Sequence, residues 1–239
     1  ADAVTYTSLI DACGKAQQLE RAFQLLGQMF IAGVRPDAFT YWALIAACAE
    51  GCDADRAFAM LRQMEAEGVK LSLQPETPYL VVITAFIDNK QLDGALKVLQ
   101  MMRDSRLQPP SLIYMELIDA CLQTPSGGLE RAFRLLQQMR EEGLEVDLET
   151  YHLLILACGE ARETGKAFEV LRMMKDASVV ANSDTYDALI NACAEGSEAD
   201  RAFDVLRQME AEGVKPSTTT YALLISARGR AQQLERAFS

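Results

Sequence analysis

VTYTSLIDACGK at residues 4–15, followed by LERAFQLLGQM at 19–29 and AGVRPD at 32–37, is the first copy of a pattern that recurs along the chain. The copies are marked by the seven tyrosines: Tyr6, Tyr41, Tyr79, Tyr114, Tyr151, Tyr186 and Tyr221. Successive tyrosines are 35, 38, 35, 37, 35 and 35 residues apart. A near-constant period of this size is the signature of a repeat protein. The two longer steps are short insertions, which linkers tolerate best.

Each copy predicts two helices joined by a short polar turn. Apolar side chains recur at helical spacing in both halves of a copy, as in the second copy: Tyr41, Leu44, Ile45 and Cys48, then Ala57, Phe58, Leu61 and Met64. Glycines just beyond the second half predict left-handed helix ends at Gly33, Gly68, Gly143 and Gly213. One such hairpin cannot bury its apolar face alone, so the hairpins are expected to stack into an all-α solenoid.

The period divides the chain into a single array of repeats. The expected repeats cover residues 3–37, 38–75, 76–110, 111–147, 148–182 and 183–217, with a partial repeat at 218–239. Because the chain starts and stops inside the pattern, it is expected to be a piece of a longer array.

The composition describes a folded, acidic chain of 239 residues. Half of the residues are hydrophobic and 24% are charged, which is typical of a globular protein. The net charge of −11 argues against a strongly basic nucleic-acid footprint. The longest apolar run, residues 79–87, is far shorter than the roughly 18 residues that would cross a bilayer, so no membrane insertion is expected. The first residues form no signal or transit peptide.

The quoted residues resemble the pentatricopeptide repeat, and the resemblance extends over the whole chain. It implies a right-handed α-solenoid in a chloroplast or mitochondrion, with a transit peptide outside this chain. Members of this family mostly bind single-stranded RNA, one base per repeat, through two side chains. These are the residue after each repeat tyrosine and the residue four before the next tyrosine. The resemblance thus implies these base-contacting candidates: Thr7, Asp37, Trp42, Met115, Asp147, His152, Asn182, Asp187 and Ser217.

The implied pairs differ in chemistry. Thr7 with Asp37 fits the family's usual preference for guanine, whereas Leu80 with Pro110 offers no side-chain hydrogen bond. Trp42 either stacks on a base or fills a gap between helices.

The partner of Trp42 is ambiguous, because Pro75 stands beside the three-residue insertion. Ser72 or Gln74 is the alternative partner. The linker candidates have a second interpretation, since side chains directly before a helix cap its free N–H groups: Asp37, Asp147, Asn182 and Ser217.

The resemblance also implies a phosphate contact nine residues after each tyrosine, where a Lys is common. Here only Lys15 and Arg230 are basic. The other positions hold Glu50, Asp88, Gln123, Glu160 and Glu195. An acid at such a position repels phosphate, so RNA contact along the whole segment is not expected.

Cysteine and histidine give no sign of a metal site or of catalysis. Five of the six cysteines stand seven residues after a repeat tyrosine, at positions that Phe86 and Arg228 occupy in other copies, which is typical of helix packing. Only Cys52 is out of register, and His152 is the sole histidine. We therefore expect no metal, no cofactor and no enzymatic activity.

Two copies are near-duplicates. Residues 47–70 read ACAEGCDADRAFAMLRQMEAEGVK and residues 192–215 read ACAEGSEADRAFDVLRQMEAEGVK. In the second stretch, Ser197 with Asp200 predicts a capping-box helix start.

Two functions therefore stay open. One is an organellar protein of RNA metabolism, acting in single-stranded RNA binding, stabilisation, processing or translation support, with this segment poor in base and phosphate contacts. The alternative is a protein-binding scaffold or structural subunit of an organellar ribosome, transcription complex or photosynthetic complex.

Overall fold

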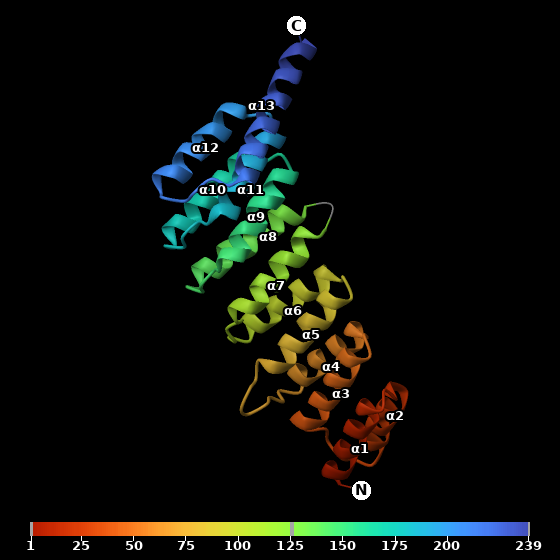
Figure 1. Cartoon of the computed structure of the whole chain (residues 1–239). Helices are drawn as coiled ribbons and strands as arrows, with labels where there is room; N and C mark the ends of the chain where they lie inside the picture. Colours follow the sequence, from red (N-terminus) through yellow and green to blue (C-terminus); the bar gives the residue numbers. More distant parts are fainter. Residues whose placement is uncertain (1, 125–126, 239) are drawn as a thin grey trace. The chain divides into compact units, whose positions relative to one another are not determined.

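The computed structural model describes residues 2–124 and 127–238. Over this part of the chain all regular structure is helical, which confirms the all-α prediction (Figure 1). The thirteen helices are α1 (Ala3–Lys15), α2 (Leu19–Ile31), α3 (Ala38–Glu50), α4 (Ala54–Ala66), α5 (Thr77–Asp88), α6 (Leu92–Asp104), α7 (Ser111–Leu122), α8 (Gly128–Glu141), α9 (Leu148–Glu160), α10 (Thr164–Asp176), α11 (Ser183–Glu195), α12 (Ala199–Ala211) and α13 (Thr218–Phe238).

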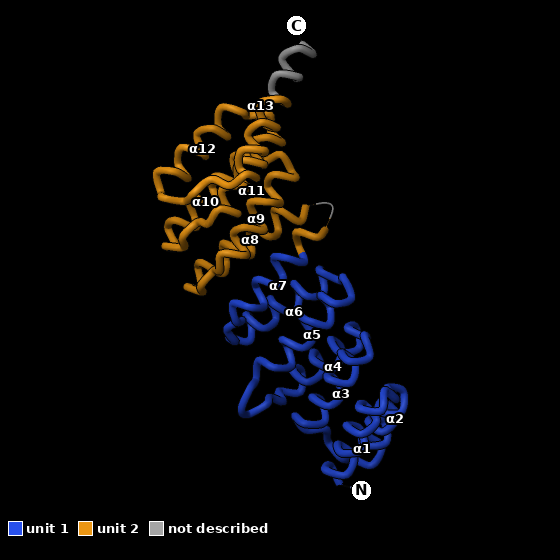
Figure 2. The backbone as a smooth tube through the Cα atoms, in the orientation of Figure 1, with its two compact units in different colours: residues 1–120 blue, residues 121–239 orange. Residues whose placement is uncertain are grey.

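The helices pack as repeated hairpins inside two compact units, residues 1–120 and 121–239 (Figure 2). In the first unit, α1 packs on α2, α3 on α4 and α5 on α6, and the first helices stack in the order α1, α3, α5. In the second unit, α9 packs on α10 and α11 on α12, while α9, α11 and α13 stack. The solenoid packing within each unit follows the prediction. The repeat boundaries, the single array and its place in a longer array stay predictions.

The repeat tyrosines anchor the core. Tyr41, Tyr114, Tyr151 and Tyr186 are completely buried, and Tyr79 nearly so. Tyr221 is 51% exposed on α13, and no hairpin follows α13 among the described residues. Tyrosine burial therefore depends on a neighbouring repeat, as the stacking of helical hairpins requires.

The cysteines in register with the tyrosines are packing residues, as predicted. Cys48, Cys121, Cys158 and Cys193 are buried. Burial raises the pKa of the Cys48 thiol to about 12 and that of Cys193 to about 11, so both stay protonated. Within residues 2–124 and 127–238, no three His, Cys, Asp or Glu side chains cluster as metal ligands.

The glycine ends of the second helices are confirmed. Gly33, Gly68, Gly143 and Gly213 have φ angles of 69°, 68°, 72° and 77°. A left-handed residue also occurs in the turns inside the hairpins. It is Gly127 between α7 and α8, and a residue other than glycine in five other hairpins: Gln17, Cys52, Lys90, Arg162 and Ser197.

Ser197 shows that one predicted helix start was wrong. Its φ is 60°, and its N–H donates to the carbonyl of Ala194, which closes the end of α11. The residue before α12 is Glu198, which makes no side-chain cap. The left-handed turn occupies Ser197, so the cap position moves one residue along.

None of the helices in the described part of the chain is long and apolar enough to cross a membrane.

Candidate nucleic-acid interface

Thr7 and Asp37 are brought together by a buried threonine. The Thr7 and Thr40 hydroxyls lie 2.7 Å apart, and the Thr40 hydroxyl donates to Asp37 Oδ1 at 2.8 Å. The backbone N–H of Thr40 donates to the same oxygen at 2.8 Å, so Asp37 also caps α3. Thr40 is completely buried. The pair implied by the resemblance is thus held as one unit across two successive repeats.

Asp187 and Ser217 have the same arrangement in the second unit. The hydroxyl of buried Thr220 donates to Asp187 Oδ1 at 2.6 Å, and the Ser217 hydroxyl donates to Oδ2 at 3.4 Å. Ser217 Oγ accepts from the backbone N–H of Thr220 at 3.2 Å. The Asp187 carboxylate is therefore fixed by two hydroxyls at the start of α13.

The remaining linker candidates act as helix caps. Asp147 Oδ1 accepts from the N–H of Thr150 at 2.8 Å, and Asn182 Oδ1 accepts from the N–H of Thr185 at 2.9 Å. The capping interpretation is therefore confirmed at all four linker positions. A capping residue keeps further acceptor capacity, so the observation does not decide against base contact.

Two other positions after a tyrosine lack this bridge among the described residues. His152 follows Tyr151, and its Nδ1 is buried without a hydrogen bond. Met115 is half-buried on α7. Met115 belongs to the first unit and its implied partner Asp147 to the second.

Trp42 lies in an apolar hollow beside the inserted linker. The hollow has a volume of about 430 Å³, and its walls include Phe39, Leu71, Ser72, Leu73 and Gln74. We call it the linker hollow. Ser72 and Gln74 line this hollow together with Trp42, whereas Pro75 lines a different cavity.

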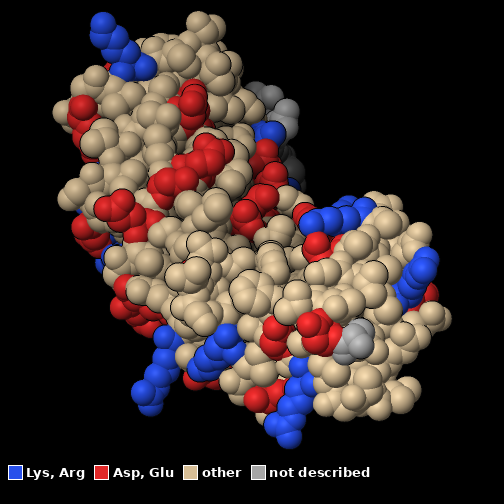
Figure 3. Space-filling view, turned by 90° about the horizontal axis from the view of Figure 1, so that it is seen from below, with Lys and Arg blue, Asp and Glu red and all other residues tan. Residues whose placement is uncertain are grey.

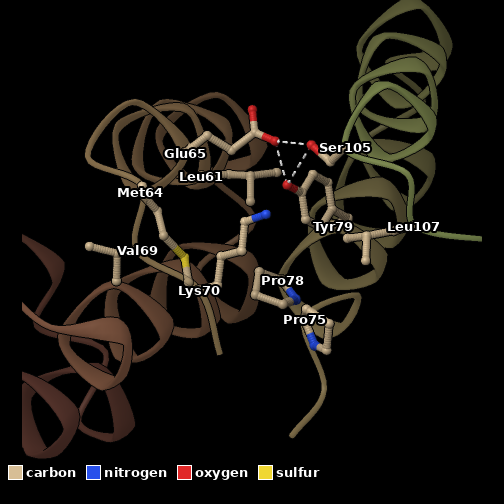
Figure 4. A pocket seen from close by; sticks show the side chains of 11 residues that line it. Leu61, Met64, Glu65, Val69, Lys70, Pro75, Pro78, Tyr79, Ser105 and Leu107 are labelled. Atoms are coloured by element: carbon tan, nitrogen blue, oxygen red, sulfur yellow. Dashed lines mark hydrogen bonds between the residues drawn. The ribbon is translucent and has the colours of Figure 1, made fainter. Parts of the chain in front are cut away.

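The cavity that Pro75 lines contains a polar cluster joining three helices (Figure 4). Glu65 at the end of α4 accepts hydrogen bonds from Tyr79 of α5 and from Ser105 after α6, the latter at 2.7 Å. Burial and the Glu65 carboxylate raise the pKa of Tyr79 to about 12. Lys70 also lines this cavity, of about 200 Å³. The cluster therefore holds together α4 and α5, the two helices that the inserted linker connects.

Family comparisons agree with this geometry. A family model described as the pentacotripeptide-repeat region of PRORP matches residues 114–239, more than half of the chain. Models described as PPR repeat family, PPR repeat and pentatricopeptide repeat domain match residues 1–50, 39–69 and 59–123. The chain belongs to the pentatricopeptide repeat family.

Solved pentatricopeptide repeat structures have the same fold. The crystal structure of PPR10 from maize matches with a TM-score of 0.68 and 27% sequence identity. The match covers 97% of this chain and 32% of the maize chain. The PPR domain of Arabidopsis thaliana protein-only RNase P 1, crystallised with tRNA, has a TM-score of 0.58 at 19% identity, covering 77% of this chain and 95% of its own.

A human relative, the mitochondrial pentatricopeptide repeat-containing protein 1, is 31% identical over 86 residues. The match covers 35% of this chain and 12% of the relative. This chain thus spans about an eighth of the human protein and about a third of the maize one.

Both basic residues at the pentatricopeptide repeat phosphate positions are paired with acids. Lys15 Nζ lies 2.7 Å from Asp11 Oδ2, and this hydrogen bond raises the pKa of Lys15, with a smaller contribution from the charge of Glu50. Arg230 pairs with Glu195, which itself holds the phosphate position of the preceding repeat. Each cation is therefore already balanced by a neighbouring carboxylate.

Asp88, at the phosphate position of the third repeat, stands near a further acid, Glu116. Partial burial raises the pKa of Glu116, and the charge of Asp88 adds to the shift. Figure 3 shows Asp and Glu side chains distributed over the face that it presents, with none of the continuous basic surface that backbone binding favours. The electrostatics of these positions oppose phosphate binding.

The sequence reasoning missed the bridging threonines. Thr40 and Thr220 stand directly before a repeat tyrosine, and the same position holds Thr5, Thr150 and Thr185. A recurring polar residue next to a core tyrosine was the available signal. Its meaning depends on contacts between repeats, which the period alone does not specify.

Proposed function

We propose that this chain is part of an organellar pentatricopeptide repeat protein of RNA metabolism, and that it contacts single-stranded RNA at two places. These are the Thr7/Asp37 pair and the Asp187/Ser217 pair. The observation that carries the proposal is the buried threonine beside each pair, Thr40 or Thr220, whose hydroxyl lies at hydrogen-bonding distance from both side chains of the pair.

Such a pair is suited to a base edge. A carboxylate accepts hydrogen bonds from the N–H groups of guanine, and a hydroxyl either donates or accepts. Because both groups are fixed before RNA arrives, little side-chain entropy is lost on binding. The remaining candidates, Trp42, Met115, Asp147, His152 and Asn182, lack the complete bridge and are proposed as weaker contacts. Lys15 and Arg230 are proposed as the phosphate contacts once their acid partners are displaced.

The relatives support an organellar role in RNA metabolism. The human relative is named as mitochondrial, and the Arabidopsis domain was crystallised with tRNA. We propose a mitochondrial or chloroplast location and a non-catalytic role for these repeats. Stabilisation, processing and translation support are proposals for the whole protein, of which this chain is one part.

The test uses fluorescence anisotropy with labelled single-stranded RNA at about 50 mM salt, where phosphate contacts are strongest. We expect weak binding that favours guanine. Asp37→Asn keeps a capping oxygen but loses the carboxylate, so the guanine preference should fall while the melting temperature stays unchanged. Asp53→Asn is the matched control, because Asp53 caps α4 in the same way, through the N–H of Arg56 at 3.0 Å.

Absence of binding at low salt would contradict RNA contact by this segment. Binding that survives Asp37→Asn and Asp187→Asn without any change in base preference would contradict the two assigned sites. Loss of binding on Lys15→Glu supports the phosphate contact at that residue.

The alternative function, a protein-binding scaffold, is favoured by the acids at the phosphate positions. Glu50, Asp88, Glu160 and Glu195 all oppose RNA along the array. In this proposal the chain docks onto protein partners of an organellar ribosome, transcription complex or photosynthetic complex. Both functions are compatible in one protein, because the two RNA sites and the acids occupy different positions.

A further inference from the structure

The linker hollow is an apolar surface that the fold leaves uncovered. Leu73 is 96% exposed and Phe39 is 67% exposed, while Trp42, which lines the same hollow, is half-buried. Its volume of about 430 Å³ is in the range of pockets that hold a small ligand or a few side chains. Clustered exposed side chains of this size mark interaction sites more often than isolated ones do.

The near-duplicate repeat indicates that folding does not require this surface. The duplicated stretches cover 24 residues and differ at four positions, 52, 53, 59 and 60 in the first copy. The second copy lacks the apolar side chains that line the hollow, since Asp184 replaces Phe39, Asp187 replaces Trp42 and Pro216 replaces Leu71. Tyr186 and Leu189 of that copy are nevertheless as buried as Tyr41 and Leu44. The apolar residues of the hollow therefore need an explanation other than the repeat fold.

We propose that the linker hollow binds a short segment of a partner protein in which an apolar side chain is flanked by Lys or Arg. The apolar side chain enters between Trp42, Phe39 and Leu73. The basic flanks are attracted by the acidic charge of the chain, to which Glu76, directly before the lining residue Thr77, contributes next to the hollow. The site is separate from the two RNA sites assigned above.

Charge selects this occupant over two others. The chain carries a net charge of −11, so a second copy would bring like charges together. An RNA strand meets the same repulsion, to which Glu50 of this repeat contributes at the position where the family commonly has a Lys. A basic segment is attracted by the same charges, and its association is faster at low salt.

The helices at the two ends of the inserted linker are held together before any partner binds. Glu65 accepts hydrogen bonds from Tyr79 and Ser105 on the other side of the inserted linker, and Pro75 and Pro78 restrict the backbone next to it (Figure 4). A linker held in this way loses little conformational entropy when a partner binds.

Trp42 supplies a direct test, because it is the only tryptophan of the chain. Peptides would be selected from a random phage-displayed library against the whole chain, and Trp-free synthetic versions titrated while Trp42 emission is recorded. We expect selected peptides with one or two apolar residues between Lys or Arg residues, and a blue shift of Trp42 emission on binding. Affinity should fall as salt rises.

Substitutions assign the binding to the hollow. Phe39→Asp copies the residue of the second repeat, and Leu73→Asp changes a side chain that is almost fully exposed, so neither should disturb folding. Each is expected to weaken peptide binding about tenfold or more, since each removes buried apolar area. Ile31→Asp is the control, because Ile31 is 89% exposed on α2 and does not line the hollow.

Selection of no peptide whose binding depends on Phe39 and Leu73 overturns the proposal. A response of Trp42 to single-stranded RNA oligonucleotides alone also overturns it and assigns base stacking to Trp42. Neither result affects the RNA sites at Thr7/Asp37 and Asp187/Ser217, which are tested by Asp37→Asn and Asp187→Asn.

Discussion

The near-duplicate repeats, α3 with α4 and α11 with α12, bury equivalent core residues. The side chains that they expose near the tyrosine differ, being apolar in the first copy and acidic in the second. Each buries its tyrosine, Tyr41 or Tyr186, and its cysteine, Cys48 or Cys193. After the tyrosine, however, the first copy presents Trp42 in an apolar hollow. The second presents Asp187, which accepts hydrogen bonds from Ser217 at the end of its own repeat and from Thr220 of the following one.

The two repeats also differ at the hydroxyl of their tyrosine. Tyr186 donates to Glu212 Oε2 at 2.6 Å, and Glu212 also pairs with Lys175 of the preceding repeat. In the first copy Phe30 stands at the position of Lys175, and the Tyr41 hydroxyl has no partner at hydrogen-bonding distance among the described residues. The nearby Glu67 carboxylate nevertheless adds to the effect of burial in raising the pKa of Tyr41.

These differences distinguish the buried residues that stabilise a repeat from the exposed side chains that are available to a partner. The apolar core is specified by the period and is shared. The residue after the tyrosine is free to change, because it lies outside the completely buried core, as Trp42 and Asp187 show. A pentatricopeptide repeat can therefore keep its fold while the side chains that it presents to a partner change.

The largest expected effect tests the shared core. Leu44→Ala and Leu189→Ala each remove a completely buried side chain and are expected to lower the free energy of unfolding by about 2–5 kcal/mol. Urea denaturation followed by circular dichroism measures both. A difference of more than about 2 kcal/mol between the two variants would show that the copies do not pack alike.

A smaller effect is expected at the tyrosine hydroxyls. Tyr186→Phe removes a hydrogen bond to a carboxylate and should cost about 1–2 kcal/mol. Tyr41→Phe should be close to neutral. Tyr151→Phe is a second control, because the Tyr151 hydroxyl is buried without a partner in the described part of the chain. Equal losses for all three variants would contradict the distinction drawn between the two copies.

The smallest effect concerns pH. The hydrogen bonds from Lys175 and Tyr186 lower the pKa of Glu212 from its ordinary 4.5 to about 2. A carboxyl whose pKa is lowered in the folded state stabilises the fold above its unfolded value, and that stability is lost as the pH falls from about 4.5 to 2.

Glu212→Gln should therefore flatten the loss of stability in this pH window, as measured by denaturation at several pH values. Glu67→Gln, at the equivalent position of the first copy, is the matched control and should change the profile less. A profile unaltered by Glu212→Gln would contradict the assigned role of Lys175 and Tyr186.

Much of the fold was predictable because it depends on local signals. The spacing of apolar residues predicted the paired helices, and Asp37, Asp147 and Asn182 were recognised as residues that stand before a helix and cap it. Glycine at Gly33 and its equivalents marked the left-handed helix ends. Each of these signals is contained within one repeat.

What escaped prediction depends on contacts between repeats or on an irregular backbone. The sequence could not specify that Thr40 and Thr220 connect one repeat to the next. It also misplaced the start of α12, because a left-handed conformation at Ser197 is not specific to that residue type. The linker hollow follows from a three-residue insertion whose alignment the period left open.

We expect the acids at the phosphate positions to keep RNA off most of this array. The direct measurement is the salt dependence of single-stranded RNA binding by the native chain and by Glu50→Lys/Asp88→Lys/Glu160→Lys. Asp55→Lys/Asp176→Lys/Glu210→Lys, on the exposed faces of α4, α10 and α12, changes the net charge equally and is the control.

The native chain should bind weakly with a shallow slope of log affinity against log salt. In the first variant the slope should steepen by about 2, at roughly 0.7 for each new phosphate contact, and the control should change it little. A native chain whose slope already corresponds to contacts in every repeat, or a variant no different from its control, would contradict the claim.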